Sequence, residues 1–261
     1  MPIISTYCKK GGVGKTTLIG YLAHYLANQG NTVLVLSADD QNSIFKIFGV
    51  EKFIYERNDN YFEYLFTGQV DPKDIVCEAR INMYLIKTLN TDRLSLTLTL
   101  ERAQERRLRA IIDDFKDRFD YVLIDFPPSS SRLTEILLDL SDKIMVVVGL
   151  DTLGLDGYIN TIQYFVDVEL EINNISHVIP TGYHPIKIAP NEALKKLKEQ
   201  VKIYTPNAIL TPPISDKSVV KNLQSEGVSV FDDYQMPSAF HQKNRDAIKK
   251  ELTSVFSSLG L

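Results

Sequence analysis

Apolar residues in this chain fall into short continuous runs, and segments with helical spacing separate these runs. The runs occupy residues 2–7, 32–38, 81–88, 121–126, 143–150 and 176–181, with a weaker one at 207–212. Continuous Val, Ile and Leu runs, unlike alternating ones, are typical of strands buried on both faces. Helical patterns lie between them, notably over residues 98–118 and 132–140. This alternation predicts an α/β fold with a doubly wound, mostly parallel sheet and helices on both faces.

The organisation along the chain predicts one domain over residues 1–261, because no linker, internal repeat or low-complexity segment interrupts the pattern. With 44% hydrophobic residues, the chain can bury a sizeable core. No apolar run approaches the roughly 18 residues of a membrane helix, and the first residues are unlike a secretory signal. Cys8 and Cys77 provide neither a disulfide framework nor a CxxC metal pair. We therefore expect a cytoplasmic protein.

Charge is distributed unevenly, although the net charge is only −4. Residues 1–185 carry 18 Lys and Arg against 25 Asp and Glu, whereas residues 186–261 carry 11 against 8. A mildly basic C-terminal part on an acidic body is compatible with a local nucleic-acid face, and equally with solvated helices.

The stretch Lys10-Gly11-Gly12-Val13-Gly14-Lys15-Thr16-Thr17 lies between the first predicted strand and a helical segment that ends at Gly30. Strand, glycine loop and helix form the context of a phosphate-binding loop, in which backbone N–H groups and the helix N-terminus face an anion. We expect residues 11–17 to bind a nucleotide, with Lys15 at the β- and γ-phosphates and Thr16 on Mg²⁺. The alternative is a plain glycine turn.

A second lysine, Lys10, precedes Gly11, and Lys9 stands where the general pattern has a glycine. The loop thus resembles the deviant Walker A motif of the ParA/MinD group of P-loop ATPases. The resemblance implies that Lys10 crosses a dimer interface to the nucleotide of the other subunit. Such a cation stabilises phosphate charge only when two subunits meet. The alternative is a solvated lysine beside the loop.

Two further motifs follow predicted strands. Ser37-Ala38-Asp39-Asp40-Gln41-Asn42-Ser43 is similar to the family's D-x-D-P-Q-x-N, with Ser37 replacing the first Asp. The resemblance assigns hydrolysis to Asp39, although Asp39 and Asp40 could instead cap the next helix. The segment 121–129, YVLIDFPPS, is similar to a Walker B strand and implies that Asp125 holds Mg²⁺ through water. The resemblance thus implies ATP and Mg²⁺ as cofactors.

The C-terminal half matches the family less closely. Residues 149–157 stand where the family has its inter-subunit loop. In the proline-containing segment 211–216, the resemblance implies that Pro213 and Asp216 bind adenine, whereas a turn with Ser215 or Asp216 as a helix N-cap is the alternative. The family's adenine-side Asn has no clear counterpart, and Thr181 stands near its place.

Among branches of this family, iron–sulfur carriers need cysteine ligands that Cys8 and Cys77 do not fit, and tyrosine kinases carry a terminal tyrosine cluster that this chain lacks. A terminal apolar stripe (Ile248, Leu252, Val255, Phe256 and Leu259) could dock on a membrane, as in MinD, but we expect it to pack in the core. The resemblance therefore favours a small ParA-type DNA-segregation ATPase.

That resemblance implies a homodimer closed by ATP, binding to DNA without sequence preference, association with the nucleoid, and release by a centromere-binding adaptor protein. Candidate DNA contacts are basic residues of the C-terminal part: Lys187, Lys195, Lys196, Lys198, Lys217, Lys221, Lys243 and Arg245. Each could equally lie on a solvated helix face. Another basic cluster, formed by Arg102, Arg106, Arg107 and Arg109, is interpreted as surface or as a partner-protein contact.

Two other functions share much of this site. One is an ATPase that positions a cargo other than DNA, such as a membrane or a protein assembly. The other is a metabolic P-loop enzyme such as a dethiobiotin-synthetase-like ligase, which would not need Lys10.

Overall fold

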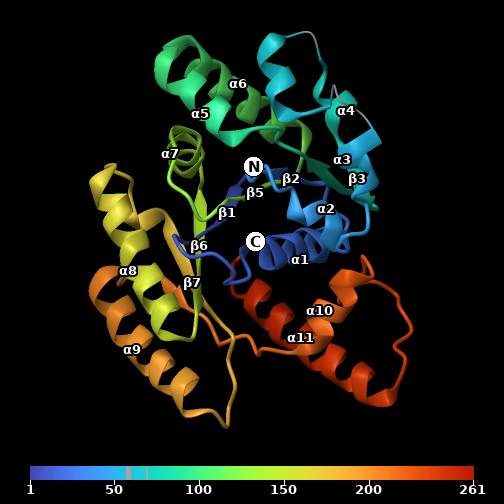
Figure 1. Cartoon of the computed structure of the whole chain (residues 1–261), viewed down its shortest axis with the longest axis vertical. Coiled ribbons are helices and arrows are strands. Elements are labelled where there is room, and N and C mark those ends of the chain that lie inside the picture. The colour runs from blue at the N-terminus through green and yellow to red at the C-terminus, as the bar shows by residue number, and fades with distance from the viewer. Residues whose placement is uncertain (57–59, 69) are drawn as a thin grey trace.

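The computed structural model describes residues 1–56, 60–68 and 70–261. At its centre an eight-stranded sheet has the order β3-β4-β2-β5-β1-β6-β7-β8 (Figure 1). Only β3 runs antiparallel among these described strands. The predicted doubly wound, mostly parallel sheet is therefore confirmed. The strands are β1 (Ile3–Tyr7), β2 (Val33–Ser37), β3 (Cys77–Arg80), β4 (Met83–Ile86), β5 (Tyr121–Asp125), β6 (Lys143–Gly149), β7 (Ile175–Thr181) and β8 (Ile209–Leu210).

Helices cover both faces of the sheet (Figure 1). One face carries α1 (Lys15–Ala27), α2 (Ser43–Ile47), α10 (Ser218–Ser225) and α11 (Ala239–Ser257). The other carries α5 (Thr91–Leu100), α6 (Arg102–Arg118), α7 (Arg132–Asp139), α8 (Thr152–Asp167) and α9 (Ile188–Tyr204). Shorter elements are α3 (Lys52–Glu56), η1 (Phe62–Thr67), α4 (Pro72–Ile75) and η2 (Ile172–Asn174).

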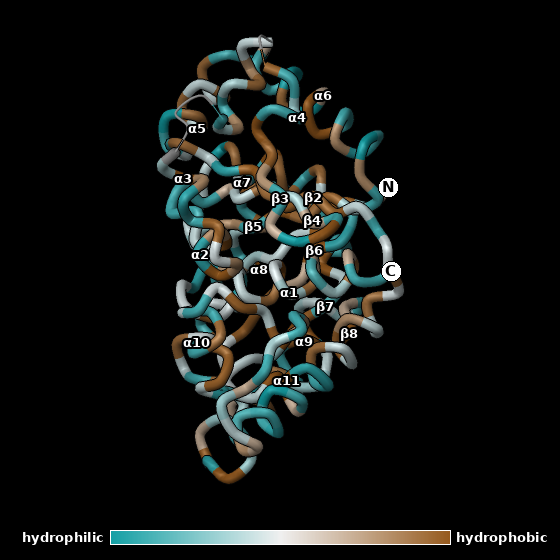
Figure 2. The backbone as a smooth tube through the Cα atoms, turned by 90° about the vertical axis from the view of Figure 1, so that its right-hand side faces the viewer, coloured by the Kyte–Doolittle hydropathy of each residue, from teal (hydrophilic) through white to brown (hydrophobic). Residues whose placement is uncertain are grey.

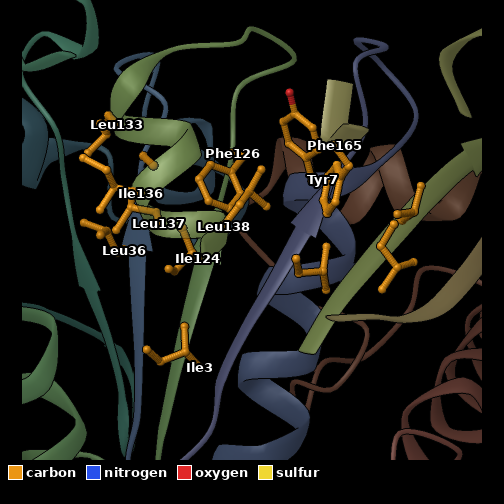
Figure 3. Packing of buried hydrophobic residues seen from close by; sticks show 14 of the residues in the cluster. Ile3, Tyr7, Leu36, Ile124, Phe126, Leu133, Ile136, Leu137, Leu138 and Phe165 are labelled. Atoms are coloured by element: carbon orange, nitrogen blue, oxygen red, sulfur yellow. The ribbon is translucent and has the colours of Figure 1, made fainter. Parts of the chain in front are cut away.

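The hydrophobic core is divided by the sheet into two clusters, because successive side chains of a strand point to opposite faces. Ile3 and Tyr7 of β1 belong to one cluster, and Ile4 belongs to the other. Figure 3 shows the first cluster, where the Tyr7 and Phe126 rings meet edge to face at 5.8 Å between centroids. In Figure 2 hydrophobic segments of the tube gather along the central strands. Buried strands on both faces explain the continuous apolar runs.

The terminal helix α11 packs its apolar stripe in the second cluster. Ile248, Leu252, Val255 and Phe256 are each at most 3% exposed, and Leu259 is 2% exposed. The predicted core packing of this stripe is confirmed. No helix of the described residues is long and apolar enough to cross a membrane.

Three elements differ from the sequence-based expectation. The helical pattern 98–118 is broken at Glu101, whose extended backbone (φ −123°, ψ 94°) ends α5 and precedes α6. The weak run 207–212 contributes only the two residues of β8, which pairs with β7 at the sheet edge. Strand β3 was not expected, because charged Glu78 and Arg80 dilute its apolar pattern. Each difference lies outside the central strands that carry the site.

Candidate nucleotide-binding site

The loop between β1 and α1 has the backbone of a phosphate cradle. Gly12 (φ +75°) and Gly14 (φ +97°) adopt left-handed conformations that strain any other residue. Helix α1 begins directly after Gly14, and its first intrahelical bond is donated by the Leu18 N–H to the Gly14 carbonyl. The N–H groups of residues 15–17 therefore have no intrahelical partner and are available to an anion.

Lys15 is buried beneath this loop, with 6% of its surface exposed. Its ammonium donates hydrogen bonds to the carbonyls of Lys10 (3.1 Å) and Cys8 (3.3 Å). Burial lowers the pKa of Lys15, while the nearby groups of Cys8, Asp125 and Asp39 oppose this shift. With two carbonyls as its partners among the described residues, this cation can turn to a stronger acceptor, and phosphate oxygens are such acceptors.

Asp125 is the last residue of β5, which lies between β1 and β2. It stands opposite Thr6 of β1 and opposite Ser37 of β2. The hydroxyl of Thr16 donates a hydrogen bond of 3.1 Å to its Oδ1. Burial raises the pKa of Asp125 to about 7, against the lowering effect of the Thr16 bond. One carboxylate and one hydroxyl suit a Mg²⁺ ion that keeps several waters and takes phosphate oxygens. These residues fit the metal, and Thr16 and Asp125 would hold it.

The raised pKa predicts that Mg²⁺ binding depends on pH. Mg²⁺ needs the ionised carboxylate, and Asp125 passes from mostly protonated at pH 6 to mostly ionised at pH 8. We expect the apparent affinity of the nucleotide-loaded protein for Mg²⁺ to rise about tenfold between these pH values. Titration of Mg²⁺ followed by nucleotide fluorescence measures this affinity. Asp125→Asn lacks the titrating carboxylate, so the pH dependence that it retains belongs to the nucleotide itself. An identical pH dependence in this variant and the wild-type protein would contradict the assignment.

Two cavities adjoin the phosphate-binding loop. The larger, of about 530 Å³, extends from Lys10 and the loop to Gly149, Ser215 and α10. The second, of about 500 Å³, extends from the loop past Asp39 to Phe126 and Pro128. Residues Gly11, Gly12, Gly14 and Thr17 line both. This volume suits a small-molecule ligand with its phosphate end on the loop.

Asp39 lines the second cavity, together with Lys15 and Thr16. Its Oδ1 accepts a hydrogen bond from the Gln41 N–H (3.0 Å), and Ser37 donates its hydroxyl to the Asp39 carbonyl (3.0 Å). Ser37 thus supports the backbone of the loop and supplies no carboxylate to a metal. The N-cap of α2 is Asn42, so the alternative that Asp39 or Asp40 caps this helix is wrong.

Lys10 lies on the rim of the larger cavity, against a glycine of α8. A Cβ added to Gly157 would lie 2.6 Å from Lys10 Cβ, so this glycine makes room for the lysine. Among the residues that the structure describes, the Lys10 ammonium has no hydrogen-bond or ion-pair partner. It is therefore available to a group outside its own chain.

The far end of the larger cavity is formed by the segment before α10. Ile214, Ser215 and Asp216 line it, and Pro213 does not. Ser215 donates both its N–H (2.8 Å) and its hydroxyl (2.9 Å) to the carboxylate of Glu251 on α11. The N-cap of α10 is Lys217, with no side-chain bond, so the N-cap alternative for Ser215 and Asp216 is wrong.

Three polar residues of the site were not assigned a role from the sequence. Glu251 holds Ser215, and Gln224 donates to the Thr17 hydroxyl at 2.9 Å. Thr181 donates its hydroxyl to the carbonyl of Val13 in the phosphate-binding loop at 2.8 Å. Each partner is distant in sequence, so no local motif marks these contacts.

The candidate DNA contacts divide into exposed lysines, lysines that line a cavity, and one buried arginine. Lys187, Lys195, Lys196 and Lys198 are exposed at or on α9, and Lys243 is exposed on α11. Lys217 and Lys221 instead line the larger cavity.

Arg245 is 6% exposed and donates to the carbonyls of Val230, Asp232 and Tyr234. The expected DNA contact at Arg245 is wrong, because its guanidinium lies inside the fold and holds the segment before α11.

The arginine cluster of α6 is partly paired. Arg109 forms ion pairs with Glu105 (3.1 Å) and Asp139 (2.9 Å), and Glu105 also binds Arg132 of α7. Arg102, Arg106 and Arg107 are exposed, as the surface interpretation expects.

Comparisons with known proteins agree with this geometry. The family model for the AAA domain (AAA_31) matches residues 1–177, which include β1, the loop, Asp39 and Asp125. An uncharacterized protein of Pseudomonas putida is 27% identical over 246 residues, 92% of this chain and 88% of its own. The chromosome-partitioning ATPase Soj of Treponema pallidum is 26% identical over 169 residues, 63% of this chain and 64% of its own.

Among solved structures, the complex of Cyanothece McdA(D38A) with ATP superposes with a TM-score of 0.80. It is 21% identical, and the match covers 100% of this chain and 97% of that one. At this identity the likeness establishes the shared fold.

Proposed function

This chain belongs to the AAA domain family matched by residues 1–177, and on this premise we propose that it is a DNA-segregation ATPase. It is an ATPase of the ParA/MinD type, with ATP and Mg²⁺ as its cofactors. In the proposed cycle ATP closes a homodimer that binds DNA without sequence preference. Hydrolysis, stimulated by an adaptor protein at a centromere-like site, then releases the DNA.

The residues have these proposed roles. Residues 11–17, Lys15 among them, bind the phosphates. Thr16 binds Mg²⁺, Asp125 holds it through water, and Asp39 positions the attacking water. Asp216, which lines the larger cavity, lies on the base side. Lys10, free of partners among the described residues, stabilises phosphate charge in the second subunit.

One observation carries the choice of DNA as cargo: α9 presents a row of exposed lysines. Lys195, Lys198 and Lys202 are exposed at helical spacing and therefore share one side of the helix, where the exposed Glu199 is the one carboxylate between Lys195 and Lys202. Lysines in such a row bind phosphates regardless of base sequence. The apolar stripe of α11, which a membrane-bound relative would need at its surface, is buried. These observations favour DNA over a membrane as the cargo.

Replacing Lys195, Lys198 and Lys202 with alanine tests this surface. We expect DNA affinity to fall at least tenfold and the slope of log affinity against log salt to decrease by about one per lost phosphate contact. Binding to random duplex DNA at several salt concentrations measures both. A matched control removes the same number of charges by replacing Arg102, Arg106 and Arg107, which are exposed on α6. Equal losses in both variants, or none in the lysine variant, would place the DNA surface elsewhere.

A further inference from the structure

Helix α10 forms a wall of the larger cavity with one face. Lys217, Val220, Lys221 and Gln224 line the cavity, at the three- and four-residue spacing of one helix side. We call these four residues the pocket face of α10. The other side of the helix carries Val219 (2% exposed) and Leu223 (1%), which are buried in the core. Packing of that side therefore fixes the pocket face toward the phosphate-binding loop.

Gln224 makes the contact between this face and the loop. Its Nε2 donates to the Thr17 hydroxyl at 2.9 Å, and both residues line the two cavities. A threonine hydroxyl has one proton to donate. Because the glutamine amide is the donor in this pair, the Thr17 proton stays free for another acceptor. The phosphate-binding side of the cavity is where such an acceptor, a nucleotide phosphate oxygen, would lie.

A buried hydroxyl of α1 lies in the same region. Tyr21 lines the larger cavity, and the side chain of Gln224 is a hydrogen-bonding neighbour of its buried hydroxyl. Lys217 and Lys221 add positive charge to the same wall. Lys217, Lys221 and the Gln224 amide supply cations and donors on the α10 wall, whereas Asp216 contributes a carboxylate at the far end of the cavity. A ligand would therefore meet the α10 wall with anionic or acceptor groups.

From these contacts we propose that the pocket face of α10 is part of the nucleotide site. Gln224 is a positioning residue that orients Thr17, and Lys221 attracts the phosphates. The two lysines thus serve nucleotide binding in place of the DNA contact expected from sequence. This inference rests on the placement of the nucleotide in the proposed function, and it is independent of what the cargo is.

Gln224→Met keeps the size of the side chain and removes the donor. We expect affinity for ATP and ADP, measured by calorimetry, to fall three- to tenfold, as expected for one hydrogen bond. Thr17→Val should also weaken binding, and the double variant should bind like Thr17→Val alone, because both changes remove one interaction. If Gln224 had a merely structural role, the losses of affinity in Gln224→Met and Thr17→Val would add in the double variant. That result would overturn the proposal.

Gln224→Glu covers the case in which the methionine variant fails to fold. The glutamate accepts the Thr17 proton and places negative charge beside the phosphates, so we expect a loss of more than tenfold. Unfolding temperatures of the nucleotide-free variants show whether each one folds. Unchanged affinity in Gln224→Glu would overturn the role of Gln224.

Lys221→Ala tests the charge on this wall. We expect a loss of at least threefold at low salt that shrinks at high salt. Lys250→Ala, an exposed lysine of α11 outside both cavities, is the control and should leave the affinity unchanged. Equal affinities of the two lysine variants would overturn the role of Lys221. If the wild-type protein bound no nucleotide, both this inference and the proposed function would be wrong. If the wild-type protein bound nucleotide and the α10 variants bound it equally well, this inference alone would be wrong.

Discussion

Replacing Lys15 with alanine is expected to lower the affinity for ATP at least a hundredfold. Lys15 is the buried cation of the phosphate-binding loop, and its ammonium is held only by the carbonyls of Cys8 and Lys10 among the described residues. Burial already lowers its pKa, so the nucleotide-free fold gains little from its charge. Its removal should therefore cost phosphate binding far more than stability. Calorimetry with ATP and Mg²⁺, together with thermal unfolding of the free protein, separates the two effects.

Lys9 offers a matched control in the same loop. Its ammonium lies over the Tyr164 ring, 4.9 Å from the centroid, and Lys9 lines neither cavity. Lys9→Ala should bind ATP within about threefold of wild type, since no phosphate contact is lost. Retained tight binding by Lys15→Ala would overturn the assignment of the loop.

Replacing Lys10 with alanine is expected to leave nucleotide binding nearly intact and to abolish ATP-driven dimerisation. The Lys10 ammonium has no partner among the described residues of its own chain, so the monomer does not depend on it. In the dimer it would neutralise phosphate charge that otherwise repels the second subunit. Sedimentation of the protein with ATP, in an Asp39→Ala background that slows hydrolysis, measures the dimer.

Gly157 provides an independent test of the same lysine. A Cβ at this position would lie 2.6 Å from Lys10 Cβ and 3.4 Å from the Cys8 sulfur, so Gly157→Ala should displace Lys10 and weaken the dimer. Lys9→Ala again serves as the control. A dimer of unaltered stability in Lys10→Ala would leave that residue without a role in assembly.

The central sheet and the phosphate-binding loop could be predicted from the sequence, because their signals are local. Buried parallel strands require continuous apolar runs, and the loop requires glycines where the backbone is left-handed, as at Gly12 and Gly14. The place of Asp125 at the end of β5 could be predicted in the same way, since a strand that ends in a carboxylate is visible in the sequence. Edge elements such as β3 carry charges and a weaker apolar pattern, and for that reason the sequence does not predict them.

Contacts between distant segments could be predicted only where both partners belong to recognised motifs, as Thr16 and Asp125 do. Glu251 holds Ser215 across 36 residues of sequence separation, and Gln224 reaches Thr17 across 207. Nor does composition tell a solvated cation from a buried one. Arg245 belongs to a basic C-terminal part, yet its guanidinium satisfies three backbone carbonyls inside the fold. Charge counts therefore indicate a basic region but do not show which of its residues are exposed.

Binding of the Asp39→Ala protein to random duplex DNA tests the central claim, a nucleotide-switched DNA association, most directly. The measurement compares the protein with ADP, with ATP, and with ATP at raised salt. We expect binding only with ATP, and its loss at raised salt, because lysine–phosphate contacts release counterions. Absence of DNA binding in every state, from a protein that dimerises with ATP, would contradict the claim and direct attention to a membrane or protein cargo.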